Sequence, residues 1–256
     1  MSLEYYKLDP AHFFTTPGLT FQAALRYSKV NLELFTDLNM LLTIERGIRG
    51  GLSFVGCRES VANNRHLPDT YDDGQESKYI AYLDANNLYA WSLRQFLAIG
   101  EYKWLSRAEI SMLDIARLPD DGEYGYVFVV DLRYPPELHS KHSDYPLAVE
   151  HLLLGQEHLS ETVKPLLGGK RYSGVKKLVS CLSDKVEYVT HYRNLKFYLR
   201  HGLVLTRIHS VIRFRQSPWL AGYIEKNTDY RKAARSAFEK DFFKLLNNRF
   251  NYKHIS

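Results

Sequence analysis

The chain has 256 residues and a formal net charge of +5, and 45% of its residues are hydrophobic. This apolar content excludes an intrinsically disordered chain, and the length suits one large domain or two small ones. A small basic surplus is compatible with nucleic acid or an anionic membrane as a partner, but it requires neither.

Targeting signals and disulfides are not expected. Cys57 and Cys181 are too few for a disulfide framework and form no CxxC motif. No run of about 18 apolar residues is present, so we expect no transmembrane helix and no membrane partner. The N-terminal residues lack the regions of a secretory signal peptide, which favours an intracellular protein in a reducing compartment.

The N-terminal third predicts helices followed by an exposed connector. Residues 15–18 (Thr-Thr-Pro-Gly) are typical of a helix start, and apolar residues then recur at helical spacing as far as Ser28. A second helical run over 38–44 ends near Gly47. Residues 60–77 are rich in Asn, Asp, Pro and Gly, which predicts an exposed loop.

The remainder of the chain mixes strands and helices. Runs of β-branched and aromatic residues predict four strands, at 79–83, 124–131, 185–189 and 203–214. A short helix lies between the last two, and residues 219–248 predict basic helical structure. This order predicts an α+β fold, and a doubly wound fold is disfavoured because its glycine fingerprint is missing.

Asp84 stands where a predicted strand turns into a predicted helix. A carboxylate at the end of a strand is exposed at the rim of the sheet, where it can bind Mg²⁺, and the carbonyl of Ala85 offers another hard oxygen. The alternative is that Asp84 only caps the following helix. Asp131 also closes a predicted strand, and we interpret it as a strand-end carboxylate without a catalytic role.

Two further segments have basic residues that suit a phosphate ligand. In the C-terminal helical stretch, Lys240 and Lys244 are four residues apart and share a face, although a solvated amphipathic helix has the same pattern. In the loop after the second helix, Arg49, Gly50 and Gly51 combine a cation with accessible backbone amides. An ordinary helix C-terminal turn would also explain these glycines.

The segment Asp84–Ala90 reads Asp-Ala-Asn-Asn-Leu-Tyr-Ala. It resembles the first palm motif of family B DNA polymerases, Asp-x-x-Ser-Leu-Tyr-Pro, in the form found in the protein-primed branch of viruses, linear plasmids and transposons. The resemblance implies that Asp84 and the Ala85 carbonyl bind the catalytic Mg²⁺ ions. It also implies that Leu88 lies near the triphosphate and that Tyr89 lies under the incoming sugar.

The C-terminal helices resemble the fingers helices of the same family, whose motif is Lys-x-x-x-Asn-Ser-x-Tyr-Gly. Lys244 and Asn248 match the Lys and the Asn of that motif. The resemblance implies nucleotide binding by both residues and a catalytic role for Lys244. Lys232 resembles an upstream triphosphate-binding lysine of protein-primed members. Residues 249–253 read Arg-Phe-Asn-Tyr-Lys, so the rest of the motif is absent.

The loop at 47–51 partly resembles the Tyr-x-Gly-Gly motif of these polymerases, which implies that Arg49, Gly50 and Gly51 contact template DNA. The implied fold is α+β, with a palm-like mixed or antiparallel sheet and a helical fingers segment. The implied partners are primer–template DNA and a dNTP, with a terminal protein where a protein primes synthesis.

The resemblance implies three regions within the chain. We expect an N-terminal helical segment with a Gly-Gly linker loop at 1–59 and a palm-like region with an insertion at 60–216. A basic fingers segment is expected at 217–256.

Family B catalysis needs a second palm aspartate, normally in an Asp-Thr-Asp hairpin after the fingers, and the sequence as far as Ser256 has none. One carboxylate cannot hold two metal ions, so we expect that this chain alone does not polymerise DNA. The alternatives are a non-catalytic DNA-binding module and an unrelated metal hydrolase that uses Asp84 and histidines such as His139.

Overall fold

The computed structural model describes residues 2–57, 59–169, 172 and 174–248; the segment 249–253 lies outside this range. Its helices are α1 (Ser2–Tyr6), α2 (Thr16–Ser28), α3 (Leu38–Gly47), α4 (Leu88–Leu93), α5 (Arg107–Ser111), α6 (His139–His142), α7 (Tyr192–Arg200), α8 (Ala221–Ala233) and α9 (Ala237–Asn248). Its strands are β1 (Leu97–Trp104), β2 (Tyr124–Arg133), β3 (Glu150–Leu153), β4 (Lys176–Val179), β5 (Lys185–His191) and β6 (Val204–Ser217).

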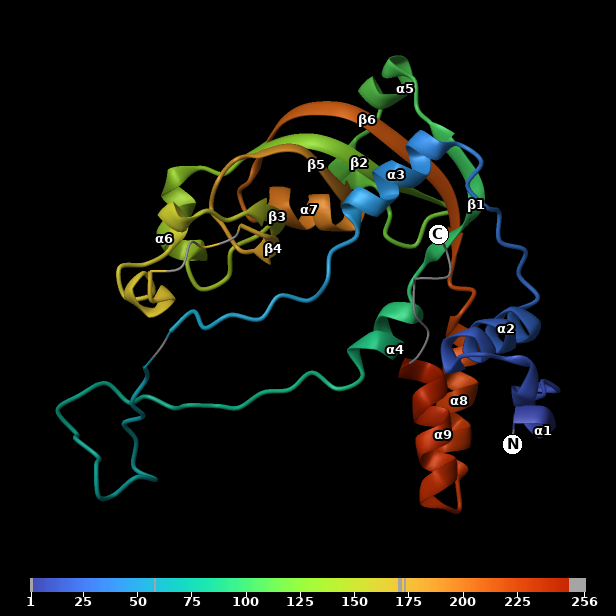
Figure 1. Ribbon diagram of the computed structural model, residues 1–256, viewed down its shortest axis with the longest axis horizontal. Coiled ribbons are helices and arrows are strands. Elements are labelled where there is room, and N and C mark those ends of the chain that lie inside the picture. Colours follow the sequence, from blue (N-terminus) through green and yellow to red (C-terminus); the bar gives the residue numbers. More distant parts are fainter. Residues whose placement is uncertain (1, 58, 170–171, 173, 249–256) are drawn as a thin grey trace.

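Four strands form a curved antiparallel sheet in the order β1-β6-β2-β5 (Figure 1). The central strand β2 is rich in Val, Phe and Tyr, and these residues suit a pleated, buried position. Phe128 pairs with Val211 of β6 and with Thr190 of β5. Strands β3 and β4 form a separate two-stranded sheet. The predicted α+β fold with an antiparallel sheet is confirmed.

The two faces of the sheet are covered by different helices, because side chains alternate along each strand. Phe128, Val130 and Leu132 belong to a buried core cluster that also contains Leu195 of α7. Burial of each such side chain contributes roughly 1.5–3 kcal/mol. The neighbouring residue Val127 points to the opposite face, where α3 packs on β5.

A helical hairpin, formed by α8 and α9, extends away from the sheet (Figure 1). Helices α1, α2 and α4 pack against it and share its core. The rings of Tyr5 and Tyr230 lie 4.5 Å apart, and the ring of Phe243 lies 5.1 Å from that of Tyr230. The buried Tyr6 hydroxyl donates a hydrogen bond to Asn227 Oδ1, which fixes α1 to α8.

Most predicted elements are present. The predicted helix start at 15–18 is confirmed, since the Thr15 hydroxyl accepts a hydrogen bond from Gly18 N at the N-terminus of α2. Strand β1 is an element that the sequence pattern did not reveal. Gly100 within it has a φ of +154° and lies against Glu33, where an added Cβ would come within 2.7 Å of the carboxylate. None of the described helices is long and apolar enough to cross a membrane.

Candidate functional site

Asp84 lies in an extended, exposed segment that leads into α4 (Figure 1). The predicted strand at 79–83 is wrong, because no neighbouring strand within the described residues pairs with it. Tyr82 and Leu83 are 96% and 88% exposed. The helix-cap alternative is also wrong, since Asn87, not Asp84, occupies the N-cap position of α4.

Helix α4, which contains the end of the Asp84–Ala90 segment, has one exposed face and one buried face. Leu88 and Tyr89 in its first turn are 59% and 74% exposed, whereas Ala90 and Leu93 are buried. Ala85 is exposed in the extended segment before the helix. The predicted nucleotide-binding side chains are therefore accessible to a ligand, while the rest of the helix anchors them.

The buried face of α4 joins the core of the α8–α9 hairpin. Its residues belong to the same core cluster as Phe243 and Leu246 of α9. An ion pair at the surface, between Arg94 Nη2 and Glu225 Oε1 at 2.5 Å, links the end of α4 to α8. The structure therefore brings together two motifs that are about 150 residues apart in the sequence.

Helix α9 presents Lys240, Lys244 and Asn248 on its exposed side, and successive members are four positions apart. Phe243 and Leu246 lie on its buried side. Lys240 and Lys244 thus share one exposed face, as their spacing predicted, although Phe238 and Leu245 are also exposed, at 73% and 42%.

Lys232 lies at the C-terminal end of α8, and its Nζ is 3.9 Å from Asp229 Oδ1 on the same helix. Both side chains are largely exposed, so this pair constrains the lysine weakly. The two helices of the hairpin are also joined by a polar contact, in which Asn247 Nδ2 donates to Thr228 Oγ1 at 3.4 Å.

The loop after α3 carries Arg49, whose guanidinium is held against the sheet. Its Nη1 donates to the Val189 carbonyl at 2.8 Å, and its Cζ lies 4.0 Å from the centre of the Tyr188 ring. Gly50 and Gly51 follow in open space, with no atom within 4 Å of an added Cβ. Arg49 thus fixes the start of the loop, and the two glycines are its accessible part.

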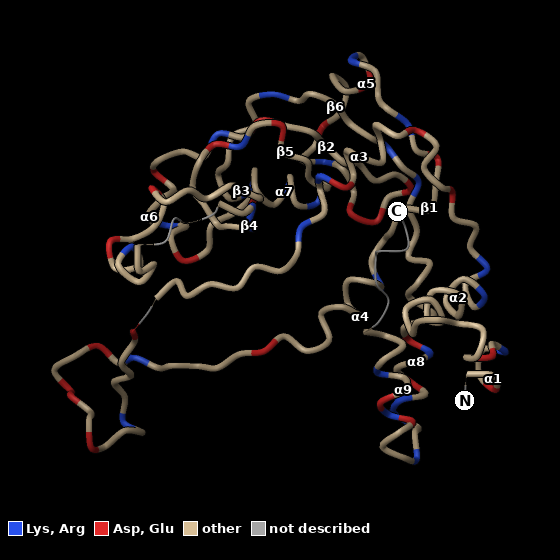
Figure 2. Tube along the Cα trace, viewed as in Figure 1, with Lys and Arg blue, Asp and Glu red and all other residues tan. Residues whose placement is uncertain are grey.

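The loop before Asp84 and the α8–α9 hairpin differ in charge. The long loop before it is mainly acidic, and the α8–α9 hairpin carries charges of both signs (Figure 2). The acidic residues of the loop are Glu59, Asp69, Asp72, Asp73 and Glu76. A phosphate backbone would be repelled by that loop, so the hairpin and the Gly-Gly loop are the better surfaces for nucleic acid.

The carboxylates of the described residues do not form a metal site. No group of three or more His, Cys, Asp or Glu side chains within them is placed to hold an ion. Asp131 is occupied by the sheet: it accepts bonds from the Glu187 amide at 2.8 Å and from His209 Nε2 at 2.7 Å. These bonds, the amide first, lower the pKa of Asp131. Asp84, in contrast, has no hydrogen-bond or ion-pair partner within the described residues.

Sequence patterns did not reveal how α4 is attached to the hairpin, because the Arg94–Glu225 pair joins residues 131 positions apart. They also did not reveal an apolar cavity between α3 and the sheet, whose lining comes from six separate segments of the chain. Neither feature has a local signal in the sequence.

Comparisons with known proteins identify the fold. The chain matches no protein-family model and no curated protein. Among solved structures it is similar to phi29 DNA polymerase in an orthorhombic crystal form, with a TM-score of 0.53 and 11% identity. It is also similar to phi29 DNA polymerase in complexes with primer–template DNA and with single-stranded DNA, each at a TM-score of 0.53 and 14% identity.

These alignments cover 97–99% of this chain but only 37–38% of the phi29 polymerase chains. The chain therefore has a polymerase-like fold and spans less than two fifths of the length of those polymerases. At this level of identity the likeness concerns the fold alone.

Proposed function

We propose that the chain is part of a family B DNA polymerase of the protein-primed branch, a DNA-directed DNA polymerase that performs template-directed nucleotidyl transfer. The observation that carries this proposal is the packing of α4 against α9. It brings the Asp84–Tyr89 motif and the Lys244–Asn248 motif to one region, as a shared nucleotide ligand would require.

The residues have distinct roles in this proposal. Lys244 neutralises charge on the triphosphate of a dNTP, and Asn248, one turn further along the helix, contacts the same nucleotide. Lys232 adds a second cation for the phosphates. Leu88 and Tyr89 provide an exposed apolar surface on which the sugar of the nucleotide rests.

Primer–template DNA is the proposed macromolecular partner. The open backbone at Gly50 and Gly51 approaches its phosphates, while Arg49 holds the loop on the sheet. In the protein-primed branch a terminal protein serves as a further partner, and the chain is proposed to take part in that mode of priming.

The residues present do not fit a complete magnesium site. Asp84 and the Ala85 carbonyl are proposed to supply oxygen ligands, but within the described residues Asp84 belongs to no group of three or more His, Cys, Asp or Glu side chains that could hold an ion. When bound, Mg²⁺ would stabilise negative charge on the phosphates.

The lack of such a group around Asp84 among the described residues favours a second candidate function, which is nucleic-acid binding without catalysis. Both candidates predict that these 256 residues bind primer–template DNA with an affinity that falls as salt concentration rises. They differ in nucleotide binding, because a part of a polymerase also binds a dNTP, whereas a DNA-binding module does not require one.

A primer-extension assay with Mg²⁺, dNTPs and purified chain tests this proposal. We expect salt-dependent binding of primer–template DNA without extension by this chain alone. Template-directed synthesis that is abolished by Asp84→Ala would contradict the expectation and favour a complete active site. Absence of DNA binding at low salt would contradict both candidates. The matched control for the assay is Asp131→Asn, because Asp131 is bonded within the sheet.

A further inference from the structure

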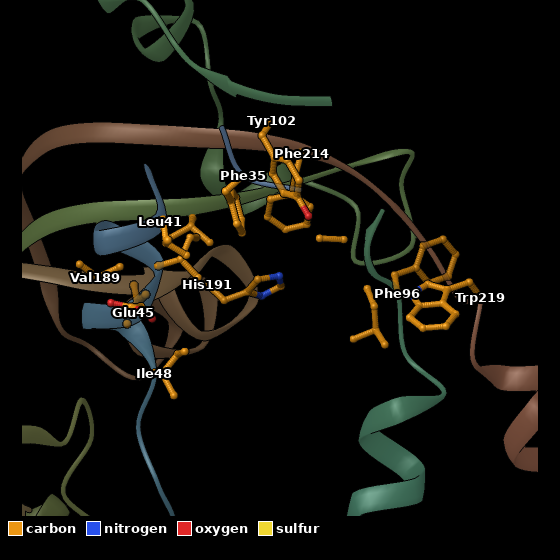
Figure 3. A pocket seen from close by; sticks show the side chains of 16 residues that line it. Phe35, Leu41, Glu45, Ile48, Phe96, Tyr102, Val189, His191, Phe214 and Trp219 are labelled. Atoms are coloured by element: carbon orange, nitrogen blue, oxygen red, sulfur yellow. The ribbon is translucent and has the colours of Figure 1, made fainter. Parts of the chain in front are cut away.

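An apolar cavity of 360 Å³ lies between α3 and the face of the sheet opposite α7 (Figure 3). Its volume falls in the range of small-ligand sites, about 300–1,000 Å³. One wall is formed by α3, with Leu41 and Ile44, and another by β5, with Val189 and His191. Its position is distinct from that of Lys244 and Asn248, which do not line it.

Aromatic rings dominate the rest of the lining. The rings of Phe35 and Tyr102 lie 4.2 Å apart at 38°, and burial raises the pKa of Tyr102 to about 12, so its hydroxyl stays neutral. Phe96, Phe214 and Trp219 complete the aromatic lining (Figure 3). Such a surface suits a flat, uncharged ring that can stack.

His191 supplies a polar group inside this apolar lining. Its imidazole points into the cavity (Figure 3), and burial lowers its pKa to about 4, so the ring is neutral near pH 7. Nδ1 accepts a hydrogen bond from the Arg193 amide at 3.4 Å. This assigns the proton to Nε2, which has no bonded acceptor within the described part of the chain.

The cavity adjoins the loop proposed to contact DNA. Gly47 and Ile48 line it, and the chain continues directly into Arg49, Gly50 and Gly51. A strand whose phosphates follow the open backbone of that loop would have its bases next to the aromatic lining. A flat heteroaromatic ring with an acceptor for His191 matches both the stacking surface and the donor at His191 Nε2.

We propose that this cavity binds one unpaired base of a single DNA strand, stacked on the aromatic rings with a ring nitrogen or carbonyl of the base accepting from His191 Nε2. The inference rests on the proposed DNA-binding function. Base stacking on aromatic side chains tolerates different sequences, so the cavity strengthens DNA binding without selecting a single base.

The test compares two fluorescent single strands of equal length, one with bases and one composed of abasic sites. Both carry the same phosphates, so the difference in their affinities isolates the contribution of the bases. We expect the unchanged chain to bind the strand with bases about tenfold more tightly. Titration by fluorescence anisotropy at fixed salt concentration measures both affinities.

Two variants test whether the part of the binding affinity that comes from the bases depends on the cavity. Phe96→Ala removes an aromatic wall, and Ala98→Phe fills the cavity with a ring while keeping a residue that suits strand β1. In both, the preference for bases should fall to about twofold or less. The matched control is Phe14→Ala, since Phe14 is fully exposed and does not line the cavity.

The outcomes separate this inference from the function on which it rests. If neither strand binds, the DNA-binding function itself is contradicted. If both strands bind equally well, or if Ala98→Phe keeps the full preference for bases, DNA binding stands and the base-binding cavity is overturned. Circular dichroism of each variant confirms that the fold is retained.

Discussion

Two segments of this molecule have a similar β-forming composition, but one is a paired, buried strand and the other is unpaired and exposed. Strand β2 (Tyr124–Arg133) is paired on both sides, and Phe128 and Val130 within it have no exposed surface. Residues 79–84 are equally rich in apolar and aromatic residues, yet they are unpaired and Tyr82 is 96% exposed. Composition made both segments suitable for a sheet, and only the availability of neighbouring strands separates them.

This difference bears directly on Asp84. The carboxylate is attached to the packed part of the molecule on its C-terminal side, through α4, while the segment before it has no strand partner among the described residues. An exposed run of strand-forming residues is a template for pairing. Asp84 would gain a fixed position when another strand or a ligand covers that run.

Hydrogen exchange should show the largest contrast between the two segments. Amides of β2 open only through near-global unfolding, so we expect protection of a thousandfold or more. Amides of residues 79–84 should exchange within about tenfold of an unstructured peptide. Mass spectrometry of peptic fragments measures both regions in one sample, and equal protection of the two segments would remove the distinction between them.

Substitutions should repeat the contrast in the free energy of unfolding. Phe128→Ala leaves a cavity in the main core and should cost about 3–5 kcal/mol. Tyr82→Ala removes an exposed ring and should change stability by less than about 0.5 kcal/mol. Urea denaturation followed by circular dichroism gives both values. A large loss for Tyr82→Ala would mean that its segment is packed in solution.

Acid should destabilise the sheet through His191, whose pKa burial lowers from 6.5 to about 4. The unfolded chain binds a proton between these values and the folded chain does not, so stability is highest above pH 6.5 and falls towards pH 4. The loss attributable to this residue is up to about 3 kcal/mol. Urea denaturation across this range should show a flatter profile for His191→Gln, while His66→Gln in the exposed loop leaves the profile unchanged.

Sequence patterns located those elements whose signals are local. The alternation and β-branching of 124–131, and the turn residues around Thr15 and Gly47, marked β2, α2 and α3 correctly. Strand β1 has no such signal, because Gly100 and the charged residues Glu101 and Lys103 interrupt its apolar pattern. It exists because β6 is available to pair with it.

The candidate site was predicted only in part, because some of its features depend on residues that are distant in the sequence. The spacing of Lys244 and Asn248 correctly indicated one exposed helix face, since helical geometry is local. The strand before Asp84 was predicted wrongly, because pairing depends on distant residues. The cavity around His191 could not be foreseen, since its lining is assembled by tertiary contacts between six segments.

The central claim is that α4 and α9 form one nucleotide-binding surface, and titration with a fluorescent dNTP tests it most directly. Loss of a hydrogen bond from a charged group costs about 1.5–3 kcal/mol. We therefore expect Lys244→Ala to weaken dNTP binding about ten- to a hundredfold. Tyr89→Ala should weaken it less, and Lys226→Ala on α8 should have no effect. Equal dNTP affinity in the unchanged chain, Lys244→Ala and Tyr89→Ala would contradict the claim.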